Sequence, residues 1–527
     1  MDTIADNARY RRILSQASLP RLGRAYSVGP FGRRVSFASQ QMRALSIVAA
    51  LQGTNTIHEK ARVAVIGAGL SGLTAAVAAR SCGAKVWLFE KMGDPFTIQK
   101  HAQHRYLHPT VNFWPEMRLS ESTNFPIFDW VEANASTVSN HLLNEWKSYQ
   151  KRINFRPFHL FTGIKKSKDD LYTIYIHNKE FNEATFDVAI FCTGFGVEEV
   201  FPPAISVPYW SPDSFSNEIH DDNINYFFSG TGDGGLIDLF RLIHKDFDSG
   251  KLCLRVIRLM EDIRLDEDIK NIEDRAFEIA DAGKDNTSKK QDLETEYKID
   301  EIYNEGYKRV ITDAGDDLNS ILGSSYFDDI ERNIIVGGTT ENGFNFSAAP
   351  IHKLMFAHSL MKNKIRYIKG KTSIKKTLTG KYKATFSSEK NKIDLSDYKI
   401  IVRHGPTSEY PIKSAIKDKT LLEQFIRRQK IFSDWIEYDG IQLPEFSNLF
   451  KFTLSKKDPH YIQTRLGKAA DYFYREHDLN TFADRKFIVS PQTPSKIDKS
   501  RLPNSLFGIE VHVGDFPHSI SRTEEDK

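Results

Sequence analysis

The stretch "RVAVIGAGLSGLTAAVAARSCGAKVWLFEK", residues 62–91, decides the fold of the N-terminal half. Four apolar residues at 63–66 predict a buried parallel strand, and a second such strand at 86–89 ends at Glu90. Between the strands lies a helical pattern closed by Gly83, a residue suited to a left-handed helix cap. Strand, helix and strand together make the βαβ unit of a doubly wound α/β sheet.

The turn after the first strand matches the pattern G-x-G-x-x-G. Gly67 permits the tight turn, Gly69 lets the backbone approach a pyrophosphate, and Gly72 lets the helix close onto the strand. Leu70 and Ser71 begin the helix, whose free N–H groups would face the phosphates. The turn therefore predicts a dinucleotide site.

Glu90 ends the second strand, 23 residues beyond Gly67, and Lys91 follows it. A carboxylate there accepts hydrogen bonds from a ribose 2′-hydroxyl and disfavours a 2′-phosphate. Strand, turn, helix and acid together favour a bound dinucleotide. The alternative is a sheet that keeps the motif without a ligand.

The bulk composition limits the function classes. A chain of 527 residues is expected to form about two or three domains, and a formal charge of +3 calls for neither nucleic acid nor a membrane surface. The three cysteines are far apart, which excludes a disulfide framework and the paired thiols of a disulfide reductase. No apolar run reaches the roughly 18–20 residues that cross a bilayer.

Residues 1–60 are expected to form an N-terminal helical extension. The first 43 residues hold eight arginines and two acids, so a transit peptide is one interpretation. The apolar residues between 42 and 51 recur at helical spacing, however, and favour a packed helix in a cytoplasmic protein.

A second signal of function is "FDVAIFCTGFG", residues 186–196, in which a buried strand runs into Thr193 and Gly194. Together with the first glycine turn, it resembles the flavoproteins with two dinucleotide-binding domains, the class of thioredoxin reductases and flavin-containing monooxygenases. Cys192 stands where that class usually has alanine. A finer resemblance, through "RYLHPTVNFWP", "TGFG" and "RHGP", is to bacterial FAD-dependent oxidoreductases of unassigned function. The likeness covers about residues 60–260.

The resemblance implies a Rossmann-like FAD-binding domain. Its FAD contacts would come from Gly67, Gly69, Leu70, Ser71, Gly72, Glu90, Lys91, Arg105, Thr193 and Gly194. Arg105 or His108 would meet the pyrophosphate or the isoalloxazine ring, since the chain after Glu90 wraps around the flavin in such proteins.

A second glycine turn lies at 230–235, after an apolar run and before a helix. In the resembling class this is the place of the NAD(P)-binding domain, which implies NAD(P) contacts from Gly230, Gly232, Asp233, Gly235 and Glu261. Glu261 is expected at the end of a partner strand, where it would favour NAD; the neighbouring arginines 258 and 264 would instead favour NADP.

Two other interpretations of this turn remain open. In the first interpretation, Gly232 and Asp233 lie against the ribityl chain of the flavin. In the second, the turn is purely structural and binds no cofactor. Gly514 and Asp515, after a late apolar run, offer the flavin a different aspartate and so favour the nicotinamide interpretation.

The predicted fold class is α/β, with two Rossmann-like domains and a mixed α+β C-terminal part. The expected boundaries are 61–215 for the FAD-binding domain with a β-meander and 216–375 for the NAD(P)-binding domain. The latter would carry an acidic, amphipathic helical insertion at 261–305. Residues 376–527 would complete the flavin domain or form an interface with a second copy or another protein.

Weak catalytic candidates are Arg403 and His404, at the end of a buried strand, and His108. No metal site is expected. The preferred function is an FAD-dependent oxidoreductase, reduced by NAD(P)H, that passes electrons to an unidentified small molecule or to oxygen. The alternative is a dinucleotide-binding sensor or scaffold with little turnover.

Overall fold

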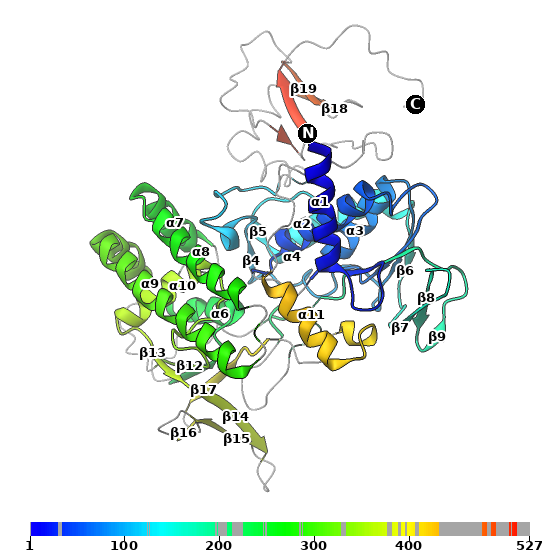
Figure 1. Cartoon of the computed structure of the whole chain (residues 1–527). Helices are drawn as coiled ribbons and strands as arrows, with labels where there is room; N and C mark the ends of the chain where they lie inside the picture. The colour runs from blue at the N-terminus through cyan, green and yellow to red at the C-terminus, as the bar shows by residue number, and fades with distance from the viewer. Residues whose placement is uncertain are drawn as a thin grey trace.

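The structure is a computed structural model with two neighbouring Rossmann-like units, drawn blue to cyan and green to yellow in Figure 1. The residues described are 2–29, 34–123, 125, 127–194, 196, 198, 208–212, 225–245, 247, 250–283, 286, 288–327, 334–376, 382–387, 392–395, 398–405 and 411–431, with the strands β18 (His477–Thr481), β19 (Lys486–Pro491), β20 (Ser505–Leu506) and β21 (Ile509–Val513). The late candidates Gly514 and Asp515 lie outside these residues.

The first unit contains a five-stranded parallel sheet in the order β1-β10-β2-β3-β6. Its strands are β1 (Ala25–Ser27), β2 (Arg62–Ile66), β3 (Lys85–Phe89), β6 (Asn154–Arg156) and β10 (Val188–Phe191). Its helices are α1 (Asp2–Ala17), α2 (Phe37–Gly53), α3 (Leu70–Ser81) and α4 (Ala135–Gln150). The α/β fold class is therefore confirmed.

Side chains alternate across the sheet, because successive residues of a strand point to opposite faces. Val63 and Val65 pack with the four helices on one face. Ala64 and Ile66 pack on the other face against a meander and residues of 411–431. The meander is β7 (Phe161–Lys166), β8 (Tyr172–Ile176) and β9 (Lys179–Glu180), and the late segment is η3 (Pro411–Ser414) and α11 (Lys419–Ile431).

Two predicted boundaries need correction. The N-terminal 60 residues are more than a helical extension, because β1 pairs with β10 at the edge of the first sheet. The predicted packed helix is confirmed as α2, which lies against α3. The second domain does not stop at 375, since β17 (Lys399–Val402) pairs with β11 (Tyr226–Ser229) inside its sheet.

The second unit repeats the plan of the first with a four-stranded parallel sheet, in the order β13-β12-β11-β17. The remaining strands are β12 (Ile334–Gly338) and β13 (Arg366–Lys369), and the helices beside them are α6 (Asp233–Ile243) and α10 (Pro350–Met361). Like the first unit, it has an antiparallel meander before its last strand: β14 (Lys371–Lys376), β15 (Tyr382–Ser387) and β16 (Lys392–Asp394).

The predicted strand after Gly250 is wrong. Those residues form α7 (Lys251–Asp262), which Gly250 begins with a left-handed backbone, φ +72°. Leu252, Val256 and Met260 are fully buried at a spacing of four residues, which is helical and not the spacing of a strand.

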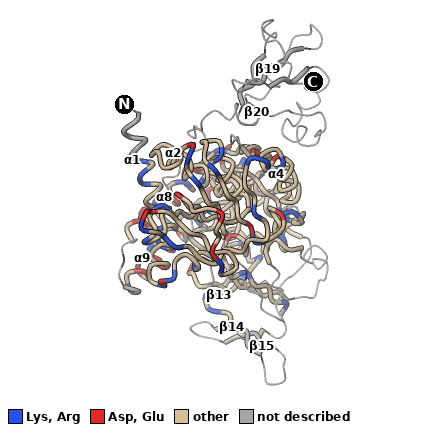
Figure 2. The backbone as a smooth tube through the Cα atoms, turned by 90° about the vertical axis from the view of Figure 1, so that its right-hand side faces the viewer, with Lys and Arg blue, Asp and Glu red and all other residues tan. Residues whose placement is uncertain are grey.

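The acidic helical insertion is confirmed, and it is longer than predicted. It continues from α7 through α8 (Asp266–Ala282) and α9 (Lys289–Ser325). Ile269, Ile272 and Ala276 of α8 are buried in the core of the second unit. Figure 2 shows acidic and basic segments interspersed along the tube of the whole molecule.

Candidate functional site

The first glycine turn connects β2 to α3, and close contacts restrict two of its glycines. A Cβ on Gly67, where φ is +99°, would lie 2.5 Å from the Cys192 carbonyl oxygen. One on Gly72 would lie 1.8 Å from the Gly67 carbonyl oxygen. Gly69 differs, because a Cβ there would meet none of the described residues within 4 Å. The turn is therefore closed by packing on both sides and open at its middle glycine.

The open side of Gly69 lies at the start of α3, where Gly69 is the N-cap without a side chain to satisfy the helix. The first N–H groups of a helix have no intrahelical acceptor, and they begin here with Leu70 and Ser71. Together with the open space, they fit a pyrophosphate.

Glu90 lies next to the same turn. Its Oε2 accepts the Ala68 N–H at 2.7 Å and its Oε1 accepts the Met92 N–H at 2.9 Å. An ionised carboxylate has about four lone-pair sites, so it can also accept ribose hydroxyls. Lys91 is exposed beside it.

Thr193 and Gly194 follow β10 and complete this edge of the first sheet. The Cβ position of Gly67 lies 3.4 Å from the Thr193 Cα, and Gly194 is exposed with φ +64°. The fold therefore brings together all the predicted FAD contacts except Arg105, and they fit the cofactor.

Arg105 has a different role from the predicted one. Its guanidinium lies against Asp238 of α6, with Nη2 3.3 Å from Oδ2, and its Nε donates to the Tyr209 carbonyl at 2.8 Å. The group is also stacked 3.8 Å above the Tyr209 ring. Arg105 thus joins the first unit to the second.

His108 is likewise a structural residue. Its Nδ1 accepts the N–H groups of Thr110 and Val111, both at 3.1 Å. The ring proton is therefore on Nε2, which lies 3.1 Å from a Glu132 oxygen. The segment that the resemblance assigned to wrapping the flavin instead turns toward the second unit.

The second glycine turn reproduces the first. Gly230 has φ +119°, and its Cβ would lie 2.1 Å from the Arg403 carbonyl oxygen; on Gly235 a Cβ would lie 2.3 Å from the Gly230 carbonyl oxygen. A Cβ on Gly232 would meet no atom of the described part of the chain within 4 Å, and Gly232 is the N-cap of α6. The open middle glycine and the free helix terminus are thus present twice.

Asp233 is committed to protein contacts. Its Oδ1 accepts the Ala349 N–H at 3.0 Å and lies 2.6 Å from Nδ1 of His352, while Oδ2 accepts from Asn112 at 3.1 Å. The carboxylate therefore joins α6, α10 and the first unit.

The predicted role of Glu261 is wrong. Glu261 lies in the last turn of α7, where its Oε1 accepts the indole N–H of Trp114 at 3.2 Å. The true partner strand is β12. Gly230 donates its N–H to Gly337, as Gly67 does to Phe89, so the position equivalent to Glu90 is Gly338. The second site therefore has no ribose acid at that position.

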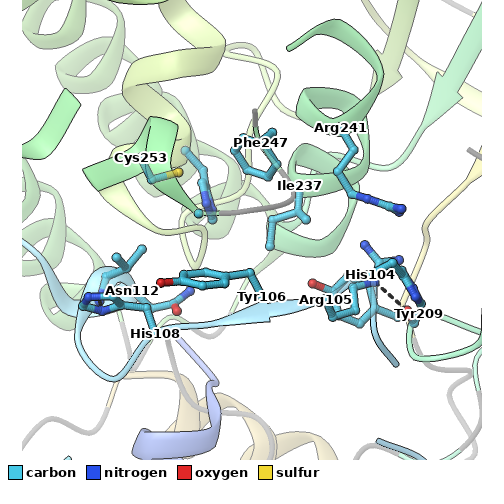
Figure 3. Close-up of a pocket in the computed structure, with 13 residues that line it drawn as sticks. His104, Arg105, Tyr106, His108, Asn112, Tyr209, Ile237, Arg241, Phe247 and Cys253 are labelled. Carbon is cyan, nitrogen blue, oxygen red and sulfur yellow. Dashed lines mark hydrogen bonds between the residues drawn. The ribbon is translucent and has the colours of Figure 1, made fainter. Parts of the chain in front are cut away.

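Arg403 and His404 follow β17, at the place that Cys192 and Thr193 have after β10. The buried Arg403 directs its Nε to Asp238, and Nε2 of the exposed His404 lies 2.6 Å from the Ser229 hydroxyl. Their predicted catalytic roles are not supported by a shared cavity, because neither residue is among those that line the cavity in Figure 3.

Asp238 is the centre of this contact between the units. It is fully buried on α6 and meets Arg105, Arg403 and Arg241, whose Nη1 lies 3.1 Å from Oδ1. Burial raises the pKa of the carboxyl, but the arginines outweigh burial and hold that pKa well below its usual range. Asp238 is thus ionised at neutral pH.

A cavity of about 70 Å³ lies between residues 104–112 of the first unit and helices α6 and α7 of the second unit. In Figure 3, Ile237, Phe247 and Cys253 form the wall opposite Tyr106 and His108, and Arg241 lies toward Arg105. Neither Arg241 nor Cys253 was predicted from the sequence. The available signal was Asp238, an acid between Ile237 and Leu239 on the apolar face of a helix, where an unpaired carboxylate would be costly.

Comparisons with known proteins agree with the first unit. The profile of the FAD binding domain family matches residues 62–98, which are β2, α3, β3 and the residues after Glu90. No curated protein matches the chain significantly. The family match supports FAD as cofactor and a flavin-dependent oxidoreductase as the class of protein.

Several solved structures share part of the arrangement. The bacillithiol disulfide reductase of Staphylococcus aureus is 11% identical, with a TM-score of 0.36 over 68% of this chain and 80% of its own. The thioredoxin reductase of T. acidophilum is 10% identical, with a TM-score of 0.32 over 68% of this chain and 81% of its own. The lysine monooxygenase of Nocardia farcinica is 10% identical, with a TM-score of 0.34 over 68% of this chain and 84% of its own.

Among the described residues, no group of three histidine, cysteine or acidic side chains is arranged to hold a metal ion. In the same part of the chain, none of the helices has the length and apolar character needed to span a membrane.

Proposed function

We propose that the protein is an FAD-dependent oxidoreductase whose flavin is reduced by NAD(P)H bound at the second glycine turn. The observation that supports this proposal is the repeated turn. Gly69 and Gly232 each leave open space at the N-terminus of a helix that follows a parallel strand. That arrangement binds pyrophosphates through backbone N–H groups.

The residues of the first unit have separate tasks in this proposal. The start of α3 binds the pyrophosphate of FAD, and Glu90 accepts from its ribose. When bound, FAD supplies a carrier of two electrons between a nicotinamide and an acceptor. Thr193 and Gly194 close the turn on the other side.

The second unit would position the nicotinamide nucleotide through the start of α6. Its ribose end contains Gly338 in place of an acid, and the neighbouring Lys369 contacts Glu341. The position equivalent to Glu90 therefore lacks the carboxylate that selects NAD, so the proposal covers both NADH and NADPH. The acceptor is a small molecule or oxygen, and the location is the cytoplasm, where the three free cysteines stay reduced.

A visible spectrum of the purified protein tests the proposal. We expect a yellow protein that bleaches when NADH or NADPH is added without air. A colourless protein that cannot be reconstituted with FAD would contradict the flavin assignment. A yellow protein indifferent to both nucleotides would contradict only the second site and favour a sensor or scaffold.

Two matched variants separate the sites. Gly69→Val places a side chain in the first open space and should abolish the colour. Gly232→Val should keep the colour and abolish bleaching, because the nucleotide loses about two charge-assisted hydrogen bonds, roughly 3–6 kcal/mol. Loss of colour in Gly232→Val would instead assign the second turn to the flavin.

A further inference from the structure

The cavity between the units is lined by three cationic side chains from three different segments. Arg105 comes from the first unit, Arg241 from α6 and His352 from α10. In Figure 3, Arg105 and Arg241 lie at one end of the cavity and Cys253 at the other. Cationic side chains from both units therefore line the cavity.

Each of these groups is charged at neutral pH. A guanidinium does not lose its proton in proteins. Burial lowers the pKa of His352, but the adjacent Asp233 carboxylate outweighs burial and raises the pKa to about 10. Asp233 and Asp238, the carboxylates paired with these groups, are not among the lining residues, and no acid is among the described residues that line the cavity.

The size of the cavity limits its ligand. One water needs about 10–15 Å³ of such volume, so 70 Å³ holds about five non-hydrogen atoms. That is the size of a carboxylate with a short stem, or of a phosphate group.

We propose that this cavity binds a small oxyanion, the carboxylate or phosphate group by which the electron acceptor is anchored. Arg105, Arg241 and His352 provide the attraction, and the apolar Ile237 and Phe247 exclude water. The assignment of the oxyanion to the acceptor rests on the proposed function. Oxyanion binding itself is independent of flavin and nicotinamide.

Cys253 provides a built-in reporter because its thiol lines the same cavity. Iodoacetate and iodoacetamide are nearly equal in size and alkylate the same thiolate, but only iodoacetate is an anion. The ratio of their rates at one cysteine therefore cancels accessibility and thiol pKa. Cys82, which does not line the cavity, is the internal control in the same molecule.

The experiment measures alkylation of each cysteine by peptide mass spectrometry on the whole protein. We expect the iodoacetate-to-iodoacetamide ratio at Cys253 to exceed that at Cys82 by about tenfold, as one moderately screened charge contact provides. Arg241→Gln should reduce this excess severalfold, and Arg241→Lys, which keeps the charge, should restore most of it.

Competition identifies the oxyanion. At constant ionic strength, acetate should slow the alkylation of Cys253 by iodoacetate if the ligand is a carboxylate, and inorganic phosphate should do so if it is a phosphate group. Equal ratios at the two cysteines, no labelling of Cys253 by either reagent, or no protection by either anion would overturn the proposal. Failure of NAD(P)H to bleach the protein would contradict the proposed function and leave oxyanion binding standing.

Discussion

Asp238 should contribute more to the stability of the protein than its single charge suggests. It is fully buried and contacts arginines from both units. Asp238→Asn keeps the shape of the side chain but leaves three buried guanidinium groups without their central anion. Breaking a buried ion pair in this way costs about 3–5 kcal/mol. In a unit of 150–250 residues, that lowers Tm by roughly 6–20 °C.

The matched control is Asp268→Asn, which also removes a helical aspartate with an arginine partner. Asp268 lies 3.0 Å from Arg309, but the two side chains are 39% and 61% exposed. Solvent screens such a pair, and its loss costs about 0–1 kcal/mol. Asp268→Asn should therefore lower Tm by no more than about 4 °C.

Differential scanning calorimetry measures both variants. Since Asp238 connects the units, Asp238→Asn should also split the melt, with the two units unfolding at separate temperatures. If Asp238→Asn and Asp268→Asn have the same Tm and a single transition, then the ion cluster does not hold the units together. Equal free energies of unfolding of the two variants in urea would also refute this explanation.

Three further outcomes are expected. Gly235→Ala should lower Tm by several degrees because of its 2.3 Å overlap, while Gly232→Ala should change Tm little; equal melts would contradict the distinction. Burial raises the pKa of Glu145 to about 7, although two hydrogen bonds to its Oε1 act to lower that pKa. The free energy of unfolding should therefore fall by about 3 kcal/mol as pH rises from about 4.5 to 7. Glu145→Gln, which keeps the acceptor, should flatten that dependence in denaturant titrations; parallel pH profiles would refute it. Glu261→Gln should leave the ratio of NADH to NADPH use unchanged, because its carboxylate binds Trp114; a changed ratio would return Glu261 to the ribose site.

The first unit could be predicted from sequence because its signals are contiguous. Strand, turn, helix and acid all fall within residues 62–91, so one short window contains the whole pattern. The partner strand of the second unit could not be found in this way. Helices α7, α8 and α9 separate α6 from β12, so the next apolar run along the chain was α7.

The contacts between the units were beyond sequence reasoning for a related reason. Arg105 and its partner Asp238 are 133 residues apart, and a pattern within one segment does not show which acid an arginine meets. The resemblance assigned Arg105 to the flavin, whereas its guanidinium lies against Asp238 of the second unit. The direction of its side chain depends on how α6 packs, which is a property of the assembled fold.

The two turns also show which glycines bear on function. Gly67, Gly72, Gly230 and Gly235 are required by packing alone, because a Cβ on any of them would overlap a carbonyl oxygen. A sheet without a ligand would need them equally.

Gly69 and Gly232 have no such requirement. Their φ values are −72° and −74°, which any residue adopts, and open space surrounds them. Each is also a helix N-cap, where serine, asparagine or aspartate would stabilise the helix more than glycine does. Neither packing nor helix stability accounts for a missing side chain at these two positions. The close approach of a phosphate, as the proposed function requires, would account for it. For Gly232 this argument does not depend on the side chains of Asp233 and Glu261, which contact other parts of the protein.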